Sequence, residues 1–272
     1  MWSIVILAIL QGVTEFFPVS SSGHLSLLEN FFSFNPSEAL GIGLVLHLGT
    51  VLSVLVFYRK VLFLFLKNLG KYKKFMLCII VACFPTGVIG LLLKNTVQAM
   101  VFNLPLIAVF FFITAVVLLF SYWGRKRFGQ GEGSVEGDFS LKHNSKLLLS
   151  SLDHLSIKAA FFIGCVQGIS VFPGLSRSGL TIATGRLLGL PPLTAGFFSF
   201  ALMVPVILGA SLLEFSTVSY TSVSMFKMFV GFMVSFLVGL VVLKALQSIL
   251  VKDKLYYFSY YLLLLILGIY LM

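Results

Sequence analysis

Long apolar runs dominate this sequence, and they constrain its fold more than any other feature. Six of them are long enough to cross a bilayer as helices, which takes roughly 20 residues. Only 10% of the residues are charged, whereas a soluble domain has about 25%. The sequence therefore predicts an all-α integral membrane protein, with transmembrane helices at residues 39–57, 75–93, 104–122, 193–213, 228–247 and 256–272.

Basic residues cluster between these runs and set the expected orientation in the membrane. The two clusters lie in loops 58–74 and 123–157. Lys and Arg are enriched in cytoplasmic loops, so both loops are expected inside and residues 94–103 outside. The net charge of +10 then reports membrane topology and not a nucleic-acid partner. Loop 123–157 is rich in Gly, Ser and charge, which is typical of a flexible connector.

Two polar stretches interrupt the apolar pattern, and they are related in sequence. Residues 11–25 and 167–181 align without gaps and are identical at six of fifteen positions. Each stretch contains Gly and Pro, and each follows an apolar run that reaches only about half-way across a bilayer core of roughly 30 Å. We therefore expect each stretch to be the turn of a re-entrant helical hairpin.

Each half of the chain is expected to hold one such hairpin and three transmembrane helices. The first repeat covers about 1–122 and the second about 158–272, on either side of the connector 123–157, in one membrane domain. An odd number of spans inverts the second copy relative to the first. Inverted-topology repeats usually place their binding site near the midplane, where the two copies meet.

The two polar stretches contribute different ionisable groups. The first supplies Glu15 and His24, and the second supplies Arg177 within a run of serines and glycines. Ionisable residues at membrane depth are costly and mark functional sites. A guanidinium suits phosphate oxygens, and an imidazole can act as a nucleophile or as a general acid and base. Glu15 can orient that imidazole, carry a proton or hold a divalent cation.

Structural roles are open for the same residues. Arg177 can pair with Glu15, which is compatible with phosphate binding, and His24 can be a packing residue. Gln11 lies one helical turn before Glu15 and can only form hydrogen bonds. His47, in the middle of an apolar run, is expected to be a helix-packing residue.

The motifs Gln11-Gly-Val-Thr-Glu15, Pro18-Val-Ser-Ser-Ser-Gly-His24 and Pro173-Gly-Leu-Ser-Arg-Ser-Gly-Leu-Thr181 resemble those of the bacterial undecaprenyl-diphosphatase family, which is linked to bacitracin resistance. The resemblance covers essentially the whole chain. It implies hydrolysis of undecaprenyl diphosphate to undecaprenyl phosphate and inorganic phosphate, which recycles the lipid carrier for peptidoglycan synthesis. It also implies the bacterial cytoplasmic membrane, a site open to the outer side, and a homodimer.

The resemblance further implies a divalent cation such as Mg²⁺ or Ca²⁺, with Glu15 as a ligand. Some relatives carry Glu at the position of Gln11, so a cation here would have one fewer anionic ligand. The expected catalytic residues are Glu15, Ser21, His24 and Arg177, and the expected substrate-binding residues are Gln11, Ser20, Ser22, Gly174, Ser176, Ser178 and Thr181.

Two alternatives stay open at this point. The nucleophile can be His24, Ser21 or water. Inverted repeats with broken helices also fit a secondary transporter or flippase for a lipid phosphate or another anion. The different ionisable groups of the two copies favour an enzyme, because transport does not need a nucleophile beside a phosphate-binding arginine.

Overall fold

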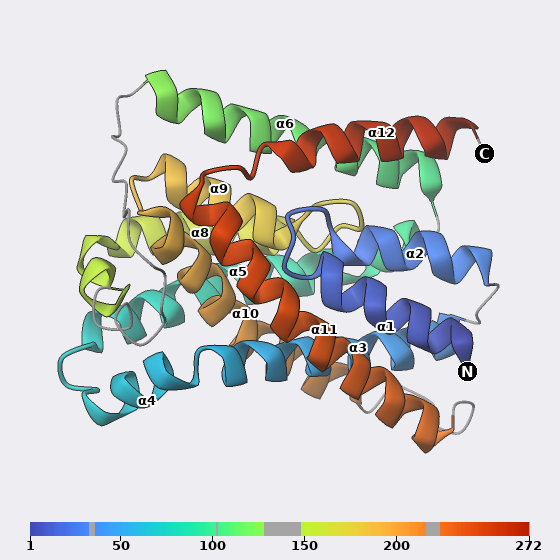
Figure 1. Cartoon of the computed structure of the whole chain (residues 1–272), viewed down its shortest axis with the longest axis horizontal. Coiled ribbons are helices and arrows are strands. Elements are labelled where there is room, and N and C mark those ends of the chain that lie inside the picture. The colour runs from blue at the N-terminus through green and yellow to red at the C-terminus, as the bar shows by residue number, and fades with distance from the viewer. Residues whose placement is uncertain (33–35, 102, 128–147, 216–223, 272) are drawn as a thin grey trace.

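The computed structural model describes residues 1–32, 36–101, 103–127, 148–215 and 224–271, and within these ranges the chain is helical with no strand. Figure 1 shows the helices packed lengthwise against one another. The elements are α1 Trp2–Thr14, α2 Ser21–Phe31, α3 Pro36–Phe57, α4 Arg59–Lys67, α5 Lys73–Met100, α6 Leu104–Arg127, the short 3₁₀ helix η1 Leu152–His154, α8 Ile157–Ile169, α9 Arg177–Leu187, α10 Pro192–Phe215, α11 Met225–Val251 and α12 Tyr257–Leu271.

The predicted transmembrane helices are confirmed for five of the six apolar runs. Among the described residues, α3, α5, α6, α10 and α11 are long and apolar enough to cross a membrane. The sixth run forms α12, which has 15 residues and is shorter than the roughly 20 of a full span. The chain is thus an all-α, multi-pass membrane protein.

Both polar stretches form breaks between two helices, as predicted. The first break joins α1 to α2 and the second joins α8 to α9. The two breaks carry the same cap, because Ser20 Oγ accepts from the N–H of Gly23 at 3.3 Å and Ser176 Oγ accepts from the N–H of Gly179 at 3.0 Å. In Figure 1 the two hairpins enter from opposite ends of the molecule and their turns meet in its middle. This is the arrangement that inverted repeats would produce.

The predicted loops are shorter in the structure. Loop 58–74 contains the helix α4, and α6 continues to Arg127. Residues 148–154 are also helical and meet α8 at an angle of 97°. The leucines of this segment pack into the main core. This packing stabilises a helix that the polar sequence around it did not predict. Residues 128–147, the rest of the predicted connector, lie outside the described part of the chain.

Small residues allow α11 to lie close to its neighbours. A Cβ on Gly49 of α3 would stand 2.1 Å from Ser235 Oγ of α11, and a Cβ on Gly12 of α1 would stand 2.7 Å from the side chain of Val238. Ser53 Oγ donates to the carbonyl of Phe236 at 2.8 Å, which links α3 to α11 again. Small residues and interhelical hydrogen bonds are the usual means of helix association in membranes. The packing holds α1, with Gln11, at a defined place beside α3.

Candidate functional site

The two hairpin turns are joined to each other directly. Ser20 Oγ, in the first turn, accepts from the N–H of Gly174 in the second turn at 3.0 Å. Ser178 Oγ donates to the carbonyl of Phe17 at 3.2 Å. Gly174 has φ of +100°, and a Cβ there would stand 2.5 Å from the carbonyl oxygen of Ile107. Only glycine suits this position, so the second turn depends on it to approach the first.

The carboxylate of Glu15 is the centre of the polar cluster that results. It forms an ion pair with Arg177 of the other hairpin, and its side chain is 1% exposed. It also accepts from Ser21 Oγ at 2.5 Å and from Gln11 Nε2 at 3.0 Å. The pairing of Arg177 with Glu15, which the sequence left open, is therefore present. The structure brings together one arginine and one carboxylate from the two halves of the chain.

Part of this cluster still has unused hydrogen-bonding capacity. Among the described contacts, Arg177 Nη1 and Gln11 Oε1 are buried without a hydrogen-bond partner. Buried polar atoms are normally satisfied, so an unpaired guanidinium nitrogen marks a place for an acceptor. The first turn of α9 begins at Arg177 and offers further N–H groups at the same break. The cluster is thus suited to an anion.

His47, expected to be a helix-packing residue, joins α3 to this cluster through a polar contact with α1. Its Nδ1 lies 2.8 Å from Gln11 Nε2 and 3.4 Å from a carboxylate oxygen of Glu15. Since Gln11 Nε2 has two hydrogens, it can donate to both neighbours at once. His47 Nδ1 then accepts from the Gln11 amide. The only sequence signal was an ionisable residue within an apolar span.

His24 lies beside this cluster but is held by other partners. Its Nδ1 is 2.8 Å from the carbonyl oxygen of Ser20, which can only accept, so Nδ1 carries the proton. Nε2 therefore has the free lone pair, and it accepts from the hydroxyl of Tyr261 at 2.8 Å. No hydrogen bond joins His24 to Glu15 in the described structure. The group that orients the imidazole is the Ser20 carbonyl and not, as predicted, the carboxylate.

Hydroxyls of the neighbouring helices α6 and α10 hold the second motif in place. Ser176 N–H donates to Thr114 Oγ1 of α6 at 3.0 Å, and the same Thr114 hydroxyl donates to the carbonyl of Gly174 at 3.0 Å. Thr181 Oγ1 lies 2.6 Å from Ser199 Oγ of α10. Thr114 and Ser199 were not recognised from the sequence, because a single hydroxyl in an apolar helix is common.

Comparison with known proteins supports the resemblance seen in the motifs. Residues 4–269 match the family model described as bacitracin resistance protein BacA. The chain belongs to the BacA family. A protein of Thermosipho melanesiensis named undecaprenyl-diphosphatase is 35% identical over 261 residues, covering 94% of this chain and 93% of that protein. Proteins with the same name from Parabacteroides distasonis and Bacteroides thetaiotaomicron are 35% and 34% identical, covering 94% of this chain and 92% and 93% of their own lengths.

The motif residues of this BacA-family chain fall into three groups. Gln11, Glu15, Ser21 and Arg177 form the polar cluster together with His47. His24 and Tyr261 form a pair beside it. The remaining expected residues form hydrogen bonds within a turn, between the two turns or to α10, and these are Ser20, Ser22, Gly174, Ser176, Ser178 and Thr181.

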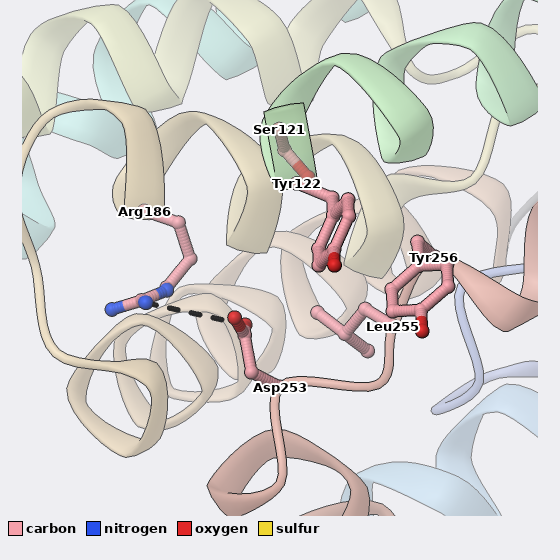
Figure 2. A pocket seen from close by; sticks show the side chains of 6 residues that line it. All are labelled: Ser121, Tyr122, Arg186, Asp253, Leu255 and Tyr256. Atoms are coloured by element: carbon pink, nitrogen blue, oxygen red, sulfur yellow. Dashed lines mark ion pairs between the residues drawn. The ribbon is translucent and has the colours of Figure 1, made fainter. Parts of the chain in front are cut away.

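A small polar pocket lies apart from the motifs. Figure 2 shows Arg186 and Asp253 facing each other across it, with Tyr122 and Tyr256 on its other side. The two charged groups are 4.0 Å apart, and Arg186 Nη1 donates to the carbonyl of Leu190 at 2.7 Å. Arg186 therefore anchors the end of α9 to the turn between α11 and α12. This pocket contains none of the expected site residues, so the polar cluster remains the candidate site.

Proposed function

We propose that the chain hydrolyses undecaprenyl diphosphate to undecaprenyl phosphate and inorganic phosphate. Membership of the BacA family and the undecaprenyl-diphosphatase name of its relatives support this activity. The observation that carries the proposal is the placement of Arg177. Its guanidinium bonds Glu15 through Nη2, has a buried and unpaired Nη1, and lies at the start of α9. An arginine at a helix N-terminus provides both charge and directed donors for phosphate oxygens.

His24 is the proposed nucleophile, because its tautomer is suited to the task. With the proton held on Nδ1 by Ser20, the lone pair of Nε2 attacks the terminal phosphorus. The bond from this phosphorus to the bridging oxygen breaks, and undecaprenyl phosphate leaves. Water then hydrolyses the phosphohistidine and releases inorganic phosphate. Arg177 stabilises the negative charge on the phosphoryl oxygens during both steps.

Ser21 is less suited to be the nucleophile. Its hydroxyl donates to Glu15, which would have to take the proton as Ser21 attacked. That carboxylate already accepts from Arg177 and Gln11 as well. Hydrogen bonds to the charged form oppose its protonation. Glu15 therefore positions Arg177 and Ser21 for the phosphate and is a poor proton acceptor.

A divalent cation, Mg²⁺ or Ca²⁺, is part of the proposal. Among the described residues, no group of three His, Cys, Asp or Glu side chains could hold a metal ion. The Glu15 carboxylate and the unpaired Gln11 Oε1 would hold the cation together with substrate oxygens. Mg²⁺ commonly binds through one or two protein oxygens, phosphates and water. When bound, the cation would neutralise charge on the diphosphate.

The proposed location is the bacterial cytoplasmic membrane, with the site open to the outer side. There the reaction would recycle the lipid carrier for cell-wall synthesis and confer resistance to bacitracin. The basic residues of α4 and its flanking turns support a cytoplasmic position for that end of the molecule. In cells, a cysteine at Asn30 should react with an impermeant thiol reagent from outside, and one at Lys67 only after permeabilisation. The reverse pattern would overturn the orientation. A homodimer is also proposed, and light scattering of the detergent-purified protein measures it.

Phosphate release from a long-chain prenyl diphosphate by detergent-purified protein tests the activity itself. We expect turnover by the wild type and by Arg59→Ala, a matched control on α4. We expect the rate of phosphate release to fall by roughly 100-fold or more in Arg177→Ala and in His24→Ala. A wild type without turnover, or full turnover in both site variants, would favour the alternative of a transporter or flippase, which needs a binding site but no nucleophile.

A further inference from the structure

The lone pair that the proposed reaction needs is already occupied by a residue outside the motifs. His24 Nε2 accepts from the hydroxyl of Tyr261 at 2.8 Å, although the two residues are 237 positions apart. Their rings lie 5.8 Å apart and almost parallel, at 9°. Tyr261 comes from α12, the last helix, whereas His24 lies one turn into α2. The contact therefore joins the two ends of the chain at the reacting nitrogen.

Tyr261 is much more exposed than the histidine that it contacts. The imidazole is 5% exposed, with Nδ1 against Ser20 and the ring edge-on to Phe111. Tyr261 is 44% exposed, whereas its neighbour Leu262 is fully buried in the contact between α6 and α12. The phenol thus stands between the buried imidazole and the outer surface of the helices. A group that approaches Nε2 from that surface must first displace the hydroxyl.

We propose that Tyr261 is a residue of the active site that covers His24 Nε2 at rest and donates to a terminal phosphoryl oxygen of the substrate during the reaction. The inference rests on the proposed function. A nitrogen lone pair that accepts a hydrogen bond cannot attack phosphorus, so the phenol must release it first. The nearest new acceptors are the oxygens of the phosphorus that Nε2 attacks. The same O–H then stabilises charge that develops in the transition state.

The competing explanation is that Tyr261 is only an aromatic packing residue. The substitution Tyr261→Phe separates the two, since it keeps the ring, its stacking and its contacts and removes only the hydroxyl. Tyr260→Phe is the matched control, because Tyr260 is on the same helix and contacts Tyr256 and Tyr257 but not His24. Elution on size exclusion and the thermal unfolding temperature show whether each variant is folded.

Two measurements test the inference. The first is the rate at which diethyl pyrocarbonate modifies His24 without substrate, mapped by mass spectrometry against the exposed His154 of the same chain. Tyr261→Phe should raise this rate by up to roughly tenfold, as expected from the loss of one hydrogen bond. The second is phosphate release, in which Tyr261→Phe should lower kcat by roughly 10- to 100-fold with a smaller change in KM. Tyr260→Phe should match the wild type in both.

The outcomes separate this inference from the function on which it rests. An active wild type with an equally active Tyr261→Phe would overturn the role of Tyr261 and leave the phosphatase proposal intact. An unchanged rate of His24 modification in Tyr261→Phe would overturn the covering role. A wild type without turnover would instead refute the proposed function, whatever the modification rate of His24.

Discussion

The guanidinium of Arg177 donates to the carboxylate of Glu15, and this ion pair connects the two hairpins of the chain. Each hairpin alone would carry an unpaired charge at membrane depth, which costs several kcal/mol or more. The pair therefore does two things at once. It stabilises the meeting of the two turns, and it holds the guanidinium that we propose to bind the diphosphate.

Separating these two contributions gives the first prediction. Arg177→Ala should lower the free energy of unfolding by roughly 3–5 kcal/mol, because it leaves the Glu15 carboxylate buried without its cation. The double variant Glu15→Gln with Arg177→Met should recover much of that stability, since neither charge remains, but it should still release no phosphate. Thermal unfolding in detergent and the phosphate assay measure the two effects. A double variant as unstable as Arg177→Ala would show that the ion pair is not the cause.

The second prediction concerns His47, which orients the Gln11 amide. In His47→Ala, one Gln11 hydrogen loses its acceptor, so the amide is free to turn and the site is less ordered. We expect phosphate release to fall by roughly tenfold, in line with the loss of one hydrogen bond. His47→Asn is the matched control, because its amide oxygen can accept near the position of Nδ1, and it should retain most of the activity. Equal activity in His47→Ala and the wild type would contradict this role.

The sequence predicted the general architecture because membrane burial leaves few choices. An apolar run of about 20 residues must form a helix in a bilayer. The internal repeat then predicted that residues 11–25 and 167–181 would meet, and the structure places their turns in contact. The motifs also contained Glu15 and Arg177, whose pairing the sequence left open as one of the possible roles of the arginine, and the structure shows the pair. These predictions rested on the lengths of the apolar runs, on the internal repeat and on the positions of the ionisable residues.

The partners that lie outside the motifs could not be predicted in this way. His47 and Tyr261 reach the site from α3 and α12, and which face of those helices turns inward depends on packing with α11 and α6. Uniformly apolar helices have no polar face that would reveal this orientation. The repeat is also misleading at Gln167. It aligns with Gln11, but both polar atoms of its side chain are buried without a partner in the described structure, since Val171 stands where Glu15 would be.

A third prediction follows from Thr114, whose single hydroxyl serves two backbone groups of the second turn. It accepts from the N–H of Ser176 and donates to the carbonyl of Gly174. Thr114→Val keeps the shape but leaves both groups unsatisfied, which should cost about 1–3 kcal/mol of stability for each group. Thr114→Ser retains the hydroxyl and should cost less than about 1.5 kcal/mol. Comparing the two by thermal unfolding isolates the hydroxyl, and equal unfolding temperatures would show that the turn does not depend on it.

The fourth prediction concerns Gly174, where backbone conformation and close contact coincide. Its φ of +100° is strained for any residue with a Cβ, and that Cβ would stand 2.5 Å from the carbonyl oxygen of Ile107. In Gly174→Ala the turn must therefore move away from α6, and its N–H must leave Ser20. We expect a loss of stability of at least about 1–3 kcal/mol and loss of phosphate release.

Gly87→Ala is the matched control for this substitution. Gly87 lies within α5, and a Cβ there would meet nothing within 4 Å. The Gly87→Ala variant should have a free energy of unfolding higher by up to about 1 kcal/mol, because alanine favours the helix over the unfolded chain. If Gly174→Ala unfolded at the same temperature as Gly87→Ala and kept its activity, the close approach of the second turn to Ser20 would not be needed for the site. The expected contrast, with one glycine replaceable and the other not, would instead show that the meeting of the two turns depends on a single backbone position.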